Sequence, residues 1–323
     1  MQFNRKKATA YESGLHLTFV IDCWKERKEN VNFLQYLING VSIGAVYAII
    51  ALGYTMVYGI AKMLNFAHGD VIMVGAYMSY SVTSYLGLPT VVGIAVAVIV
   101  CTLLGMLIEG LAYKPLRGVP SLAVLITAIG VSYFLQNAAQ LIWGSAPKNF
   151  KSIVSMSPIV LFNGQLTITG EVIYTIVASV LIMVALTLFI NKSRMGKAMR
   201  AVSEDRAAAQ LMGINVNQTI STTFAIGSAL AAVAGVLLCS TVPTLMPTTG
   251  SMPGIRAFTA AVFGGIGSIP GAMLGGILLG VIETFSKAYL STQFSDAIVF
   301  LVLIVILLVK PAGLLGKQIQ EKV

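Results

Sequence analysis

The chain has 323 residues, of which 57% are hydrophobic and only 10% are charged. A soluble domain carries about 25% charged residues, so this composition excludes a soluble globular protein and indicates a polytopic membrane protein. The net charge of +9 does not indicate nucleic-acid binding, because six basic residues lie in the first thirty positions and five lie in one central loop, where topology determinants are found.

The first thirty residues are polar and mixed in charge, unlike the rest of the chain. Their one apolar run, Leu15–Ile21, is interrupted by Thr18 and is too short to span a bilayer or to form the core of a signal peptide. We expect residues 1–30 to form a polar N-terminal tail, either a flexible cytoplasmic tail or the product of an upstream start. Residues 31–323 are expected to form the transmembrane domain.

Long apolar windows follow the tail and predict an all-α membrane domain. Two further pieces, Lys62–Asp70 and Arg256–Gly267, are too short or too polar to cross a membrane alone, and glycine or proline flanks both. This is typical of broken helices that line a cavity, and it brings the expected total to about eight to ten membrane elements. The predicted spans are Leu37–Tyr58, Val71–Leu86, Val91–Leu111, Ser121–Trp143, Val172–Ile190, Thr219–Leu238, Ala272–Ala288 and Ala297–Val309.

The distribution of basic residues predicts the sides of the membrane. The loop with Lys114 and Arg117, the central basic loop and the C-terminal lysines belong inside, so Gly144–Gly170 and Thr241–Gly254 belong outside. The side of the N-terminal tail stays open. If Lys62–Asp70 re-enters without crossing, the tail also lies inside, as its basic residues favour.

The most informative loop, Asn191 to Asn217, is a polar interruption between two spans. Ser203 is a good N-cap, Glu204 and Asp205 suit a first helical turn, and Gly213 suits a C-terminus. This pattern predicts a helix of about ten residues, capped at both ends, that something outside the bilayer holds. The alternative is an ordinary basic cytoplasmic loop, which explains the charge but not the two caps.

Three polar residues, Asn65, His68 and Asp70, lie together on the broken piece. A charge at the bilayer centre costs at least about 2.5–3.5 kcal/mol on insertion scales. These residues either shape a translocation path or its gate, or Asn65 and His68 cap and satisfy the freed backbone of a broken helix, with Asp70 at a helix start. The residues alone favour neither interpretation.

Other charges near the membrane have simpler expected roles. Glu109 is expected to pair within its cytoplasmic loop, five residues before Lys114, and Glu283 to pair with Lys287 on the same helical face. Arg256 either anchors a binding protein or a substrate carboxylate, or lies at the membrane interface for its own solvation.

Motifs for nucleotide or metal chemistry are missing from the sequence. It contains no G-x-x-x-x-G-K-[ST] loop, so we expect no ATP site and no catalytic residues. The glycine-rich run Gly264–Gly276 has Pro270 where a dinucleotide fingerprint needs its third glycine, and it predicts close helix packing around a tight turn. With His16 and His68 as the two histidines, neither a metal site nor a cofactor is expected.

Five blocks of sequence carry a specific resemblance. The run NGVSIGAVYAIIALGYTMVYGIAKMLNFAHGD (Asn39–Asp70) resembles the opening of the branched-chain amino acid ABC transporter permeases of the Liv type. Later blocks are similar as well: RMGKAMRAVSEDRAAAQLMGIN (Arg194–Asn215), AFTAAVFGGIGSIPGAMLGG (Ala257–Gly276), AYLST (Ala288–Thr292) and PAGLLG (Pro311–Gly316). The resemblance extends from about Val31 to the C-terminus and is closer to the H-type subunit than to the longer M-type subunit.

The resemblance implies a type II ABC importer-like fold in the lipid of a bacterial inner membrane. In this family a periplasmic binding protein delivers the amino acid to a permease heterodimer, and two cytoplasmic ATP-binding subunits drive alternating access. The second permease subunit, the ATPases and the binding protein are therefore the expected partners. The central loop would supply the coupling helix, although it lacks the later proline of the importer EAA…G pattern. The residues assigned to coupling are Ser203, Glu204, Arg206, Ala207, Ala208 and Gly213.

Three alternatives remain at this stage. A permease of the same superfamily for urea or short-chain amides would share the NFAHG block. A secondary transporter would share the broken helices but would need no capped cytoplasmic helix. A membrane enzyme would need a nucleophile or metal constellation that the sequence does not offer.

Overall fold

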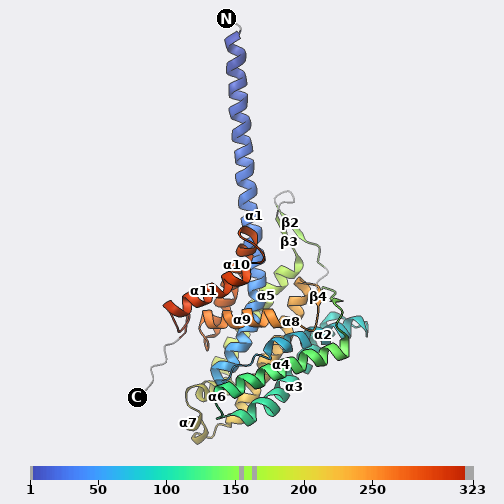
Figure 1. Ribbon diagram of the computed structural model, residues 1–323, viewed down its shortest axis with the longest axis vertical. Coiled ribbons are helices and arrows are strands. Elements are labelled where there is room, and N and C mark those ends of the chain that lie inside the picture. Colours follow the sequence, from blue (N-terminus) through green and yellow to red (C-terminus); the bar gives the residue numbers. More distant parts are fainter. Residues whose placement is uncertain (1–2, 153–155, 162–165, 317–323) are drawn as a thin grey trace.

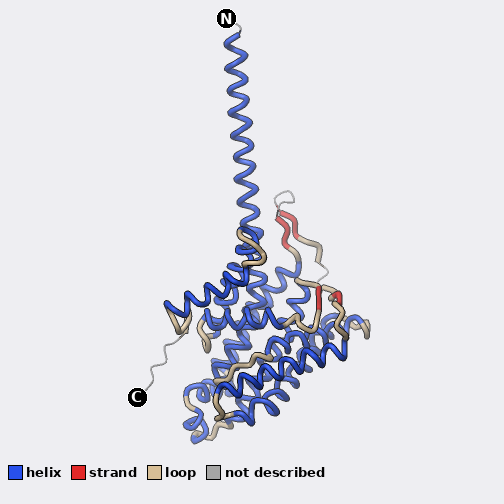
Figure 2. The backbone as a smooth tube through the Cα atoms, viewed as in Figure 1, coloured by secondary structure: helices blue, strands red, loops and turns tan. Residues whose placement is uncertain are grey.

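The computed structural model describes residues 3–152, 156–161 and 166–316, with side chains from residue 32 onward (Figure 1). Within these residues the chain is helical apart from loops and four strands of two or three residues, drawn in red in Figure 2. The helices are α1 (Phe3–Ala61), α2 (His68–Ser84), α3 (Thr90–Ile108), α4 (Ser121–Trp143), α5 (Gly170–Lys192), α6 (Arg194–Glu204), α7 (Arg206–Leu211), α8 (Val216–Thr241), α9 (Ser251–Gly264), α10 (Ile269–Tyr289) and α11 (Ser295–Val309). A π-turn, η1 (Glu109–Tyr113), and a 3₁₀ turn, η2 (Lys114–Leu116), extend α3, and the strands are β1 (Lys148–Asn149), β2 (Ile159–Leu161), β3 (Leu166–Ile168) and β4 (Thr244–Leu245).

Every predicted span overlaps one helix. Six helical stretches of the described residues are long and apolar enough to cross a membrane. The bundle also contains three shorter helices, α2, α9 and α11. The prediction of an all-α polytopic membrane protein is confirmed. The six stretches are Asn32–Ala61, Thr90–Leu116, Ser121–Trp143, Gly170–Lys192, Val216–Thr241 and Ile269–Tyr289.

The two predicted broken pieces differ from each other. Most of Arg256–Gly267 lies in the short helix α9, which ends at Gly264. Lys62–Asp70 is not a separate element: residues 62–67 are non-helical, and the last three residues are the first turn of α2. Residues 3–30, predicted as a polar tail, form the first part of α1. The boundary of the permease domain at residue 31 stays a prediction.

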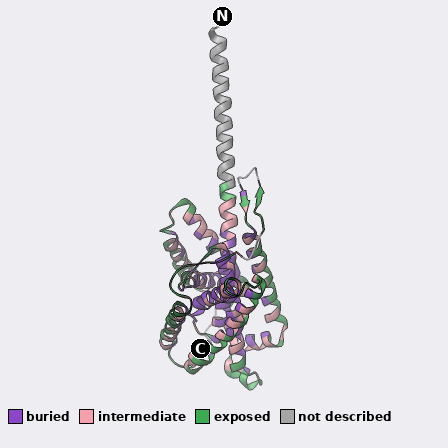
Figure 3. Ribbon diagram, turned by 90° about the vertical axis from the view of Figure 1, so that its right-hand side faces the viewer, coloured by how far each residue is buried: buried purple, intermediate pink, exposed green. Residues whose placement is uncertain are grey.

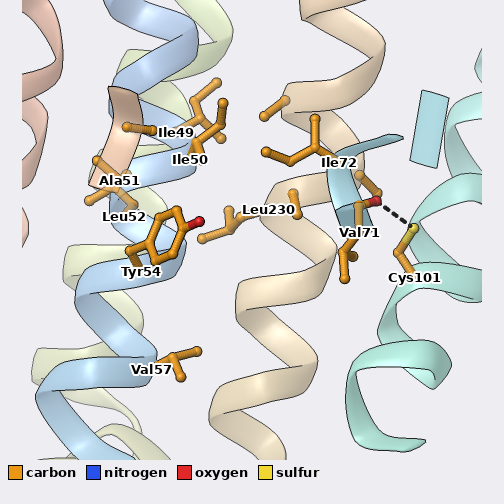
Figure 4. Packing of buried hydrophobic residues seen from close by; sticks show 14 of the residues in the cluster. Ile49, Ile50, Ala51, Leu52, Tyr54, Val57, Val71, Ile72, Cys101 and Leu230 are labelled. Atoms are coloured by element: carbon orange, nitrogen blue, oxygen red, sulfur yellow. Dashed lines mark hydrogen bonds between the residues drawn. The ribbon is translucent and has the colours of Figure 1, made fainter. Parts of the chain in front are cut away.

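Helix α1 is the central helix of the bundle. In its most apolar window 89% of the residues are buried, against 28%, 22% and 17% for α3, α4 and α5, which are therefore peripheral. Figure 3 shows the buried residues gathered along the part of α1 inside the bundle. In Figure 4, Tyr54 and Val57 of α1 face Leu230 of α8, and Val71 of α2 lies on the other side of α8.

Glycines allow α1 and α10 to pack with their backbones in contact. A Cβ atom added at Gly280 would lie 2.3 Å from the Cα of Gly44, and one added at Gly276 would lie 2.5 Å from the Cα of Ala48. The close packing predicted from the glycine spacing is therefore present, because helices in a membrane associate best where small residues let backbones approach.

Contacts between loops group them as the charge distribution predicted. The segments predicted outside meet where β1 pairs antiparallel with β4. Of the segments predicted inside, Arg117 donates a hydrogen bond to Asn217, and α6 and α7 lie at the opposite end of the bundle from β2 and β3 (Figure 1). That the α7 end is the cytoplasmic one remains a prediction from the basic residues.

The start of the bundle part of α1 lies on the predicted outer side. The side-chain amide of Gln35 donates to the Thr167 carbonyl of β3 at 3.0 Å and accepts from the Thr167 amide at 2.9 Å. From there α1 crosses the bundle to Ala61, which contacts α7 at the opposite end, and the non-helical residues 62–67 follow there. If the α7 end is cytoplasmic, this packing of α1 places its N-terminal part on the outer side, against the preference of the basic residues of the tail.

Replacing Gly280 with alanine should weaken the α1–α10 contact. The added methyl group would overlap backbone atoms of α1, and overpacking of this kind typically costs about 1–3 kcal/mol. We expect a lower thermal unfolding midpoint in detergent. Gly130→Ala is the matched control, because Gly130 lies within α4 and has nothing within 4 Å of an added Cβ. Equal midpoints for the two variants would contradict the role assigned to this packing.

Candidate functional site

The break between α1 and α2 is the first part of the candidate site. Helix α1 ends at Ala61, and Lys62 adopts a left-handed conformation with φ of 54° while its amide donates to the Tyr58 carbonyl at 2.9 Å. The chain then runs without regular structure to His68, whose amide donates to the Asn65 carbonyl at 3.2 Å. The left-handed residue acts as the C-terminal stop that a glycine more often supplies.

The side chain of Asn65 is buried and points away from the start of α2. Its Oδ1 accepts a hydrogen bond of 2.9 Å from the hydroxyl of Tyr113, in the π-turn after α3. No side-chain hydrogen bond caps α2, whose N-cap residue is Ala67. The side chains of Asn65 and His68 therefore do not cap this helix, and that part of the structural alternative is wrong.

Asp70 lies in the first turn of α2, as expected, and takes part in a polar cluster inside the bundle. The amide Nε2 of Gln136 on α4 lies 2.9 Å from Oδ1 of Asp70 and 3.2 Å from the hydroxyl of Ser251, the first residue of α9. Asp70 is 2% exposed. The starts of two broken helices, α2 and α9, are thus joined through Gln136, and the Asp70 carboxylate suits the positive end of the α2 dipole.

Glycines bring the two helix starts together. A Cβ at Gly250 would lie 1.8 Å from the carbonyl oxygen of Gly69, and one at Gly254 would lie 2.9 Å from the Cα of Gly69. Gln136 and Ser251 were not expected from the sequence. The signal that could have indicated them is a polar residue inside the predicted span Ser121–Trp143, and a serine directly after a glycine before the short segment.

His68 is fully packed beside α1. Its ring lies 4.6 Å from that of Tyr54 in an edge-on arrangement, and its Nε2 is buried without a hydrogen-bond partner. A Cβ at Gly53 would lie 2.5 Å from this nitrogen, so glycine is needed opposite the histidine. A small cavity beside Asn65, lined by Tyr54, Phe258 and their neighbours, has about 10 Å³ of space, enough for one water and far too little for an amino acid. In the described part of the chain, this cavity therefore has no room for a substrate beside Asn65.

A second charged cluster fastens α9 to its neighbours. Arg256 donates to Glu283 at 2.8 Å and to the hydroxyl of Tyr47 at 3.0 Å, and it also pairs with Asp296 at the start of α11. The predicted pair of Glu283 with Lys287 is confirmed at 2.5 Å. The guanidinium of Arg256 is bonded to residues of this chain, and its side chain is 15% exposed. In this structure Arg256 therefore anchors α9 to the neighbouring helices.

Glu109 has a different partner from the one expected. It pairs with Arg117 rather than with Lys114, and its second oxygen accepts from the hydroxyl of Ser221 on α8. Glu109 begins the π-turn η1, and Arg117 follows directly after the 3₁₀ turn η2. The prediction that Glu109 pairs within its loop is confirmed, but its partner is Arg117 and not Lys114.

The central loop folds into two helices instead of one. Ser203 is not an N-cap: it lies near the end of α6, where its hydroxyl donates to the Arg200 carbonyl at 2.7 Å, and Glu204 is the last residue of α6. The N-cap of α7 is Asp205, whose Oδ1 accepts from the amides of Ala207 at 2.8 Å and Ala208 at 3.0 Å. A carboxylate that accepts two amide hydrogen bonds caps more strongly than a hydroxyl, which explains the later start.

Gly213 closes α7 as predicted, with φ of 81° and its amide bonded to the Gln210 carbonyl at 3.0 Å. The short helix carries an exposed apolar face, formed by Ala207, Ala208, Leu211 and Met212, which we call the α7 face. Leu211 is 89% exposed and Met212 is 83% exposed. Leu211 and Met212 each follow one of the two alanines by four residues, a spacing that places them on the same side of a helix. The sequence analysis did not consider this spacing.

Arg206, the first residue of α7, points back into the protein. Its guanidinium donates to the carbonyl of Ala61, the last residue of α1. Beside it lies a cavity of about 660 Å³, open at the α7 end, whose lining includes Arg117, Arg206 and Asn215. The structure therefore brings Arg206 to the break that precedes Asn65, His68 and Asp70, a contact between residues 145 positions apart.

Comparison with known proteins identifies the family. The family model described as "Branched-chain amino acid transport system / permease component" matches residues 36–307. The chain belongs to this family. It is 48% identical over 303 residues to the high-affinity branched-chain amino acid transport system permease protein LivH of Salmonella typhimurium, with 90% of this chain and 98% of the relative covered.

Two further comparisons have similar extent. BraD of Pseudomonas aeruginosa, also a high-affinity branched-chain amino acid transport system permease protein, is 46% identical over 308 residues, with 91% of this chain and 99% of that protein covered. Among solved structures, PsaBC from Streptococcus pneumoniae in complex with Fab is matched at a TM-score of 0.48 and 14% identity, over 86% of this chain and 92% of that one.

The side of the membrane that α7 faces can be tested by cysteine labelling. In a background without the native cysteines, Ser157→Cys in the predicted outer loop should react with an impermeant thiol reagent added to intact cells. Leu211→Cys should stay unlabelled there and react in inverted vesicles from cells without the partner ATPases, because the basic loops set this end inside. The reverse labelling pattern would overturn the assignment of the two faces.

Proposed function

We propose that this protein is the inner-membrane permease subunit of an ABC importer for the branched-chain amino acids leucine, isoleucine and valine. The observation that carries the proposal is the identity of 46–48% over 98–99% of the length of relatives named as permeases for these substrates. In this role the chain forms part of the translocation path and does not hydrolyse ATP itself.

The proposed partners are a second permease subunit, two cytoplasmic ATP-binding subunits and a periplasmic substrate-binding protein. The absence of a nucleotide-binding motif from the sequence supports ATP hydrolysis by separate subunits. The apolar windows of α3, α4 and α5 are mostly exposed, so these helices have free faces for a second permease subunit and for lipid.

The proposed contact with an ATPase is the α7 face. Apolar side chains as exposed as Leu211 and Met212, outside the membrane-spanning helices, indicate a protein partner. Helix α7 is fixed at both ends by Asp205 and Gly213, so it presents this face rigidly and loses little entropy on docking. Small residues at Ala207 and Ala208 leave room for the partner to approach.

Asn65, His68 and Asp70 are proposed to border the translocation path and to act as part of its gate. All three are buried in this conformation, and the space beside Asn65 is closed. The buried, unpartnered Nε2 of His68 and the cluster of Asp70 with Gln136 are polar groups that an opened path would expose. A permease supplied by a binding protein needs little affinity of its own, because the delivered ligand arrives at high local concentration.

Replacing Ala208 with arginine should uncouple ATP hydrolysis from uptake, because a long charged side chain would hold the ATPase away from the α7 face. The permease should still insert and fold. Gln210→Arg is the matched control: it adds the same charge to the same exposed helix, away from that face. Leucine uptake in membrane vesicles is the measurement, and equal uptake by both variants would remove the docking assignment.

Leucine uptake by the reconstituted complex should be inhibited by isoleucine and valine and not by urea. Asp70→Asn should slow uptake, because the negative charge at the meeting point of α2 and α9 is lost, while the order of competitors stays the same. That order should follow the binding protein. Competition mainly by urea would favour the short-amide permease instead, and a changed order in Asp70→Asn would mean that the permease itself selects the substrate.

A further inference from the structure

We propose that Arg206 is the positioning residue that connects α7 to the break after α1, so that displacement of α7 moves residues 62–67. The inference rests on the proposed function, in which an ATPase docks on the α7 face. It assigns a route by which that docking reaches Asn65, His68 and Asp70.

The contact joins the C-terminal end of α1 to a positively charged side chain at the start of α7. The last carbonyl groups of a helix have no partner within the helix and carry partial negative charge. Ala61 is the last residue of α1, and its carbonyl accepts a hydrogen bond from the guanidinium of Arg206. A bond with a charged donor is stronger than one between neutral groups, so this contact holds α7 and the end of α1 together.

The segment beyond Ala61 is suited to move. Lys62 is the one residue other than glycine with a positive φ in the described part of the chain. Between the backbone bonds of Lys62 to Tyr58 and of His68 to Asn65, no regular structure fixes the chain. A pull on the Ala61 carbonyl therefore passes into a segment with few backbone restraints, where Met63 packs against the core and the bond between Asn65 and Tyr113 is the first side-chain hydrogen bond of those described.

The surroundings of Arg206 favour a contact that can break. Burial and the nearby Arg117 guanidinium lower the pKa of Arg206 below its usual value. The positive charge of Arg206 is therefore repelled by that of Arg117 at its present position. Arg117 is itself fastened by Glu109 and Asn217 and does not move aside easily. The cavity next to both arginines has room for the Arg206 side chain to swing away. Two arrangements of one long side chain would give α7 and the break two coupled positions.

Arg200 offers a matched control. It lies in α6 of the same loop, it is exposed, and its guanidinium is 3.4 Å from the Asn191 carbonyl, away from the break. Arg200→Gln and Arg206→Gln remove the same charge from the same loop. Any effect of overall charge on ATPase binding should therefore be equal in the two variants.

The experiment uses the full complex in proteoliposomes, with the native cysteines replaced and a spin label on Lys62→Cys, which is exposed. In the otherwise unchanged protein and in Arg200→Gln, addition of ATP and loaded binding protein should change the mobility of the label. In Arg206→Gln that change should be lost and uptake should fall about tenfold, the effect of one charge-assisted hydrogen bond, while ATPase subunits still co-purify and still hydrolyse ATP. Arg206→Lys, which keeps a charged donor, should recover part of the uptake.

Two outcomes would overturn the proposal. One is a normal label response with normal uptake in Arg206→Gln. The other is loss of co-purifying ATPase in Arg206→Gln but not in Arg200→Gln, which would place Arg206 in assembly and not in transmission. Failure of the proposed function is separate from both, because there the unsubstituted permease would bind no ATPase and Ala208→Arg would leave uptake unchanged.

Discussion

Inside a bilayer every backbone polar group must find its partner within the protein, and this structure depends on how that requirement is met at interrupted helices. Helix α1 stops at Ala61 and α9 stops at Gly264, yet both ends are covered by other parts of the bundle. The Ala61 carbonyl accepts from Arg206, and the carbonyls of Phe263 and Gly264 accept from the amides of Leu314 and Leu315 near the C-terminus. A helix can be broken inside a membrane where protein groups replace water as hydrogen-bond partners. In this permease both helix ends have such partners.

Charged groups in the bundle follow the same requirement. Glu109, Asp70 and Glu283 are each buried, and each is met by a donor from another helix: Arg117 or Ser221, Gln136, and Arg256. Such pairs add little net stability when desolvation is counted, but removing one partner leaves an uncompensated charge. Their effect is to fix which helices are neighbours. The cluster at Glu283 holds α9 against α10, and the cluster at Asp70 joins α2, α4 and α9, the helices nearest the proposed path.

The central loop illustrates the limits of local reasoning. Ser203 and Asp205 are both residue types that serve well as N-caps, and only Ser203 was expected to be one. In the structure the Ser203 hydroxyl donates to a carbonyl within α6, and the Asp205 carboxylate accepts the free amides at the start of α7. Gly213 was easier to predict, since few other residues tolerate its backbone conformation. The spacing of Leu211 and Met212 from Ala207 and Ala208 indicates one helix face, but the fold decides that this face is exposed.

The sequence by itself determined the membrane class, the positions of the spans, the family and the grouping of the loops, because these depend on hydropathy, charge and motifs that act locally. Only the tertiary structure decided the partners of Glu109, Asp70 and Arg206, the end of the bundle at which α1 enters, and the closed space beside Asn65. Those features depend on contacts between residues far apart in the chain. Their distances follow from how helices pack through glycine contacts such as that of Gly44 with Gly280, which no single segment of sequence specifies.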